Sequence, residues 1–146
     1  MGEIMKIAID PGWSGSIALV DDQFNVSVDK MPETIFDIIN YFKELDCNEN
    51  VVCIMEKVGA MPRDGRKALW RFSENVTTLK CALYMARIST AEVTPRVWQG
   101  KLGVVMPKEK KDRKNKIKAL MQQKYPHIKV VLWNADSLAI LATSTV

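Results

Sequence analysis

The stretch Met5–Leu19, MKIAIDPGWSGSIAL, decides the fold of this chain. It begins with an apolar run that ends at Asp10 and reads as a strand, and a proline and two glycines then bend the chain before a second strand at 16–20. The pattern predicts a β-hairpin with a carboxylate at its mouth. Asp10 can simply begin a turn, where aspartate is common. The glycines beside it also allow a phosphate to approach the backbone closely, so a functional interpretation stays open.

Composition sets the class of protein. The 146 residues suffice for one domain with a substantial core, and we expect a single domain over 1–146. The formal net charge of +4 is compatible with a polyanionic partner, although a modest excess of lysine is usual on a solvated surface. The three cysteines lack metal-ligand spacing, and no apolar run approaches the roughly 18 residues that span a bilayer. With no signal-peptide pattern at the start, we expect a soluble, intracellular protein.

Apolar periodicity predicts the remaining elements. In chain order they are a strand at 24–28, a helix at 35–45, strands at 51–55 and 90–94 separated by a helix at 68–87, a helix from 95 to about 102, a helix that ends before Pro126, a strand at 129–133 and a helix at 135–143. The first three strands are expected to form an antiparallel meander. The run at 51–55, VVCIM, is continuously apolar, which is typical of a central strand covered on both faces.

Two acidic residues end apolar strands. Asp10 ends the first strand, and Glu56 ends the strand at 51–55. If these strands are adjacent and parallel, both carboxylates lie side by side at one edge of the sheet, where they repel each other unless a cation or a proton lies between them. Hard divalent metals prefer oxygen ligands, so Mg²⁺ is the expected occupant.

Two segments are rich in basic residues. The stretch 58–67, VGAMPRDGRK, predicts an exposed, mobile, cationic loop, and Trp70 follows it, off the apolar stripe of the next helix. Trp70 can stack on or wedge between bases, or it can be covered by a neighbouring element or a dimer partner. The second segment, 108–118, is either a solvated helix face compensated by Glu109 and Asp112 or a surface that contacts phosphates.

The last part of the chain offers one more acid. Asn134 is a plausible helix N-cap, which places Asp136 in the first turn of the final helix. The helix macrodipole favours an acid there in any case. His127 is the only histidine and is expected at the surface, so a histidine general base is not expected.

Three sequence segments together resemble the RuvC-type Holliday-junction resolvases of the RNase H-like superfamily, as a small phage or prophage-like member. They contain Asp10 in IAIDPGWSGSIAL, Glu56 in VVCIMEKVGAMP and Asp136 in NADSLAILA, and the match runs in order over essentially the whole chain. The resemblance implies an α/β, RNase H-like fold with a five-stranded mixed sheet, three antiparallel strands and then parallel ones, flanked by helices. It also implies a homodimer that makes paired, symmetric cuts in four-way DNA junctions during recombination and repair, in the cytoplasm of a bacterial or phage-infected cell.

The resemblance also implies roles for individual residues. Asp10, Glu56 and Asp136 would be ligands of two Mg²⁺ ions, with Mn²⁺ as a substitute, and no histidine nucleophile is required. Lys114, or failing that Lys111, would lie near the scissile phosphate. The implied DNA contacts are Arg63, Arg66, Lys67, Trp70, Lys108, Lys110, Lys111, Arg113 and Lys114.

The sequence departs from the family pattern at two places. Many members carry a further aspartate one helical step before the closing acid, where this chain has Trp133. The helix after the second acid is often glycine-spaced in relatives, whereas SENVTTLKCAL contains no glycine, so Trp70 and Phe72 are only candidates for an aromatic that opens a junction.

Three other functions remain in view. A broader nuclease for branched or flapped DNA would keep the fold and the acids, and a junction-binding protein without cleavage is compatible with the tryptophan at 133. An actin-like or sugar-kinase ATPase shares the phosphate hairpin, but such proteins usually need two copies of this domain and a second glycine-rich loop, both of which this sequence lacks.

Overall fold

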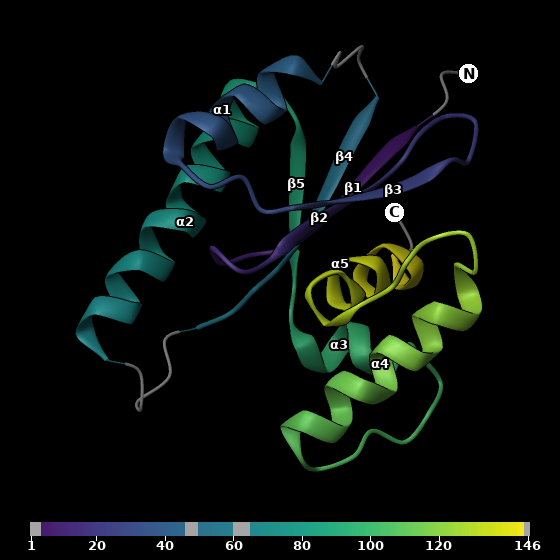
Figure 1. Ribbon diagram of the computed structural model, residues 1–146. Coiled ribbons are helices and arrows are strands. Elements are labelled where there is room, and N and C mark those ends of the chain that lie inside the picture. The colour runs from purple at the N-terminus through teal and green to yellow at the C-terminus, as the bar shows by residue number, and fades with distance from the viewer. Residues whose placement is uncertain (1–3, 46–49, 60–64, 145–146) are drawn as a thin grey trace.

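The computed structural model describes residues 4–45, 50–59 and 65–144 (Figure 1). The helices and strands of these residues follow one another as β1 (Met5–Asp10), β2 (Ser16–Val20), β3 (Val26–Lys30), α1 (Ile35–Glu44), β4 (Val51–Glu56), α2 (Arg66–Met85), β5 (Ser89–Val93), α3 (Pro95–Gly100), α4 (Lys110–Lys124) and α5 (Leu132–Thr143). None of the helices in these ranges combines the length and apolar character needed to cross a membrane.

The five strands form one mixed sheet in the order β3-β2-β1-β4-β5. The pairs β1–β2 and β2–β3 are antiparallel, and the pairs β1–β4 and β4–β5 are parallel. This arrangement confirms the predicted RNase H-like sheet, with a meander followed by parallel strands. It also places β1 and β4, the two strands that end in acids, next to each other.

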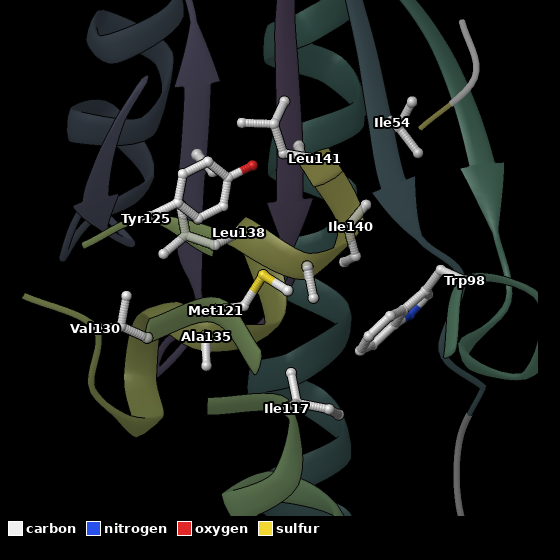
Figure 2. Close-up of a cluster of buried hydrophobic side chains, with 13 residues drawn as sticks. Ile54, Trp98, Ile117, Met121, Tyr125, Val130, Ala135, Leu138, Ile140 and Leu141 are labelled. Atoms are coloured by element: carbon white, nitrogen blue, oxygen red, sulfur yellow. The ribbon is translucent and has the colours of Figure 1, made fainter. Parts of the chain in front are cut away.

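Helices cover both faces of the sheet, α1 and α2 on one and α3, α4 and α5 on the other (Figure 1). The alternation of side chains along β1 sorts its residues between the two faces. Ile7 and Ile9 are fully buried against α1 and α2, whereas Ala8 belongs to the cluster formed with α3, α4 and α5. Figure 2 shows the part of this cluster that α3, α4 and α5 contribute. Full burial of each isoleucine contributes about 1.5–3 kcal/mol. Because Ala8 and its neighbour Ala18 are small, α5 can pack directly on the centre of the sheet.

The third strand begins later than its sequence suggests. It was expected at 24–28, but β3 starts at Val26 because residues 21–25 form a turn. The Asp21 carboxylate accepts hydrogen bonds from the backbone N–H groups of Gln23 and Asn25, and Phe24 between them has a φ of 64°. The backbone of this turn cannot join the sheet ladder.

The predicted strand at 129–133 is wrong. Leu132 and Trp133 form the first turn of α5, which therefore starts three residues before the expected position. The Asn134 side chain explains the difference, since its Oδ1 accepts from the Val131 N–H at 2.9 Å and its Nδ2 donates to the Lys129 carbonyl at 3.1 Å. Asn134 is the third helical residue rather than the N-cap, and Asp136 consequently lies in the second turn of α5.

Candidate functional site

Asp10 and Glu56 lie at the same edge of the sheet. Asp10 is the last residue of β1 and Glu56 is the last residue of β4, and the parallel register pairs Ile9 with Met55 immediately before them. Their strand neighbours two positions back, Ala8 and Ile54, both belong to the cluster beneath α5. Since side chains on a strand alternate between faces, both acids are placed on the α5 face.

A buried hydrogen bond brings Asp136 to the same place. Ser16 pairs with Asp10 across the β1–β2 ladder, and its Oγ lies 2.6 Å from the Oγ of Ser137. Both serines are fully buried. Because Ser137 follows Asp136 on α5, this bond fixes the second turn of the helix over the strand pair that ends in Asp10.

The charges of the three acids affect one another. Burial raises the pKa of Asp10 well above its ordinary value, and the negative charges of Asp136 and Glu56 raise it further, while Lys114 opposes them. Burial also raises the pKa of Glu56, against the lowering effect of a hydrogen bond from Trp98. The pKa of Asp136 is raised because burial outweighs the opposing positive charges of Lys114 and Lys110 on α4.

The donor chemistry of these residues fits a hard divalent cation. Partly buried carboxylates that repel one another gain from a cation between them, and their oxygens are the ligands that Mg²⁺ and Mn²⁺ prefer. The fit is one of charge and donor type: within residues 4–45, 50–59 and 65–144, no three histidine, cysteine, aspartate or glutamate side chains already form a cluster that could hold a metal ion.

The raised pKa of Asp10 predicts an unusual stability profile. Its pKa is higher in the folded than in the unfolded chain, so its contribution to stability is fully present below about 3.8 and is lost as the pH rises through the folded value. Asp10→Asn removes this dependence. Without metal, thermal unfolding should therefore show the variant about 1–2 kcal/mol more stable than the wild type at pH 7.5, with the difference shrinking towards pH 4. A variant less stable than the wild type at pH 7.5 would contradict the assigned repulsion.

The turn after Asp10 is docked on α2. Gly12 has a φ of 110°, and its N–H donates to Oδ1 of the fully buried Asn75 at 2.7 Å. The Trp13 indole donates to the Arg71 carbonyl at 2.9 Å. Phe72 is partly buried and lies next to Gly12, which accounts for its position without a role at DNA. The same stretch of α2 therefore supports the turn that carries Asp10.

Basic residues lie at the starts of two helices that cover opposite faces of the sheet. Arg66 and Lys67 belong to the first turn of α2 rather than to the predicted loop, and Trp70 on the same helix is 77% exposed, so no element of the described residues covers it. The starts of α2 and α4 point towards the same end of the molecule (Figure 1). Arg63 lies outside the described residues, and the loop expected at 58–67 is described only in part.

The lysines of α4 differ in their relation to the acids. Lys110 and Lys114, four residues apart on one helical face, are the cations whose charges act on Asp136, and Lys114 also acts on Asp10. This favours Lys114 over Lys111 as the lysine of the site. Arg113 instead donates to the carbonyls of Pro107 and Lys108. Among the described residues, no lysine or arginine of α4 forms an ion pair with Glu109 or Asp112. Direct pairing with these two acids therefore does not neutralise the basic side chains of α4.

Several residues that build the site were not singled out from the sequence. Asn75, Ser16 and Ser137 are short polar side chains inside apolar patterns, and such interruptions are the only sequence signal that marks them. Trp98 lies in the helix expected from 95 to about 102, but nothing in the sequence connects it with Glu56. His127 is exposed, as expected.

Comparison with solved structures identifies the fold. The mixed five-stranded sheet, with an antiparallel meander followed by parallel strands and helices on both faces, is an RNase H-like α/β fold. Within that class the chain has the fold of RuvC. It matches T. thermophilus RuvC in complex with a Holliday junction substrate at a TM-score of 0.65, with 15% identity, over 96% of this chain and 91% of that one. A second Thermus thermophilus RuvC structure matches at a TM-score of 0.66, with 14% identity, over 96% and 92% of the two chains. No family model and no curated protein sequence matches the chain.

Proposed function

We propose that this protein is a metal-dependent endonuclease that cleaves four-way DNA junctions by paired, symmetric phosphodiester hydrolysis, in recombination or repair. The observation that carries the proposal is that β1 and β4 end side by side in Asp10 and Glu56, beneath the turn of α5 that carries Asp136, whose charge acts on Asp10, in a chain with the fold of RuvC. A related RuvC structure contains a Holliday junction substrate. The closeness of that fold over nearly the full length of both chains supports the same substrate class here.

The proposed metal ligands are Asp10, Glu56 and Asp136. A pair of bound Mg²⁺ ions would supply a deprotonated water as nucleophile and neutralise the charge on the leaving oxygen. The chain itself contributes rigid placement: Asp10 and Glu56 are fixed by the parallel ladder, and Asp136 is fixed by the Ser16–Ser137 bond next to it. Lys114, whose charge reaches both aspartates, is the proposed contact to the scissile phosphate.

The proposed DNA surface joins the starts of α2 and α4. Its described members are exposed or charged side chains, namely Arg66, Lys67, Trp70, Lys108, Lys110, Lys111 and Lys114. Arg63 extends the set by sequence alone, and Arg113 is a weaker member because it binds the chain's own carbonyls. Two symmetric cuts require two sites, so the active species is proposed to be a homodimer.

We expect junction binding to depend steeply on salt. If about six of these cations contact phosphates, the affinity for a four-way junction should fall about a thousandfold between 50 and 200 mM monovalent salt, because each neutralised phosphate releases counterions. Fluorescence anisotropy in the absence of metal measures this directly. A flat response would exclude the basic surface as the main source of affinity.

The test of the proposed function is cleavage of synthetic DNA in Mg²⁺. A labelled four-way junction should receive paired cuts in strands of the same polarity, and duplex DNA of the same sequence should remain intact. Equal cutting of flaps and three-way forks would favour the broader branched-DNA nuclease. A junction bound tightly but never cut would favour a binding module. The observation that favours this alternative is Trp133, which stands where many family members have a further acid and whose ring lies 5.3 Å from the Lys30 ammonium.

A further inference from the structure

We propose that Trp98 is a positioning residue for Glu56, holding its carboxylate in one orientation at the sheet edge. This inference rests on the proposed function, since it assigns Glu56 to the metal site, and it adds a residue that the sequence did not connect with that site. It concerns the tryptophan on α3, which contacts one of the three acids.

The contact is short and buried. The Trp98 indole Nε1 donates to Oε2 of Glu56 at 2.6 Å, and the two residues are 1% and 9% exposed. An indole has a single donor, and a buried donor left without an acceptor destabilises the fold. A hydrogen bond to a charged group is about twice as strong as one between neutral groups. The indole and the carboxylate therefore hold each other.

The backbone places Trp98 opposite Glu56. Strand β5 pairs with β4 so that Val93 lies next to Glu56, and the Lys57 N–H donates to the Val93 carbonyl at 2.8 Å. Helix α3 begins two residues later, with Pro95 in its first turn, and carries Trp98 back over the end of β4. The distance between the two side chains is thus set by a strand pairing and one short helix.

Packing restrains the rest of the ring. Trp98 belongs to the apolar cluster that includes Ile117 of α4 and Ile140 of α5, and Figure 2 shows its ring beside these helices. The same cluster carries α5, on which Asp136 lies. A ring fixed on its apolar side can orient a carboxylate on its polar edge, which lowers the cost of ordering that carboxylate around a cation.

The indole proton is a direct reporter of this contact. In a spectrum of the ¹⁵N-labelled protein, one indole N–H should lie far downfield, should move upfield in Glu56→Gln, because a neutral amide is the weaker acceptor, and should shift saturably as Mg²⁺ is added to the wild type. If no indole resonance responds to Glu56→Gln or to Mg²⁺, the proposal is overturned. This measurement remains valid even where a variant of Trp98 itself does not fold.

The matched substitution is Trp98→Phe, which keeps an aromatic ring and removes the donor. Calorimetric titration should show an affinity for Mg²⁺ about tenfold below that of the wild type, with kcat on a junction reduced to a similar degree and KM unchanged. Tyr41→Phe removes a hydroxyl that donates to the Asp29 carboxylate at 2.9 Å, in the cluster between the sheet and α1, and should leave the Mg²⁺ affinity unchanged. Wild-type Mg²⁺ affinity and kcat in a folded Trp98→Phe protein would overturn the proposal.

Separate results would exclude the positioning role of Trp98 and the proposed function. If Glu56→Gln abolishes Mg²⁺ binding while Trp98→Phe binds Mg²⁺ as the wild type does, the positioning role is wrong and the metal site stands. If the wild type neither binds Mg²⁺ nor cuts a junction, the proposed function is wrong.

Discussion

Glu56→Gln is expected to bind a four-way junction as tightly as the wild type and to cut it about a thousandfold more slowly. The same result is expected for Asp10→Asn. Each exchange removes one charged oxygen donor from the sheet edge and leaves the lysines of α4 and the start of α2 in place. In Glu56→Gln the carbonyl oxygen of the introduced amide could still accept the Trp98 indole N–H, so the packing of β4 should survive. Single-turnover cleavage and metal-free binding assays on the same preparations measure the two effects separately.

Glu92→Gln is the matched control for that exchange. Glu92 lies on β5 opposite Met55, one residue before the position next to Glu56, and its partner is Lys80 at 2.9 Å rather than another acid. A surface ion pair contributes about 0–1 kcal/mol, so this variant should fold and cut normally. Joint loss of binding and cleavage in Glu56→Gln, with Glu92→Gln intact, would mean that the Glu56 carboxylate supports the structure rather than the reaction.

Gly15→Ala is expected to destabilise the protein by about 3 kcal/mol or more, which for a chain of this size lowers the melting temperature by about 10 °C. A Cβ at this position would lie 1.9 Å from the carbonyl oxygen of Asp10, and backbone cannot yield as a flexible side chain does. The Gly15 N–H also closes the turn on the Gly12 carbonyl at 2.9 Å. Any displacement here moves Asp10, so cleavage should fall even below the melting transition.

Gly100→Ala separates this steric effect from the general effect of replacing a glycine. Apart from its chain neighbours and the backbone of its own helix, no atom of the described residues lies within 4 Å of a Cβ built at Gly100, at the end of α3. Removing the flexibility of glycine there should change stability by at most about 1 kcal/mol, in the stabilising direction. Thermal unfolding of both variants gives the comparison, and a Gly15→Ala protein as stable as Gly100→Ala would contradict the described turn.

Local patterns predicted the sheet and the position of two of the acids. The strands that end in Asp10 and Glu56 are long apolar runs closed by a polar residue, and the hairpin glycines fix the direction of the return strand. In these two runs the strand predicted from apolar periodicity is the strand found in the fold. The arrangement of the strands, an antiparallel meander followed by parallel strands, was implied by the resemblance to the RuvC-type resolvases, since the residues alone left open whether the strands that end in acids are adjacent.

The prediction failed where one side chain redirected the backbone. The run KVVLW has the composition of a strand, but Asn134 satisfies the backbone at 129 and 131, and the helix starts at Leu132 instead. Likewise, Asp21 extends the turn before β3. Such hydrogen bonds compete with the sheet ladder and are not visible in apolar periodicity.

The contacts that hold the acids in place could not be read from the sequence because they join distant residues. Ser16 and Ser137 are 121 positions apart, Gly12 and Asn75 are 63 apart, and Glu56 and Trp98 are 42 apart. Each pair forms only when the helices are packed on the sheet. The sequence therefore indicated the candidate acids, and the fold shows which contacts hold the segments that carry them.

The central claim is that Asp10, Glu56 and Asp136 hold divalent cations without a fourth acid at Trp133. A crystal structure of the protein soaked in Mn²⁺, with anomalous data, tests this claim most directly. We expect anomalous density between the three carboxylates in the wild type and none there in Asp10→Asn. The absence of density there at saturating Mn²⁺, or density only at other acids, would contradict it.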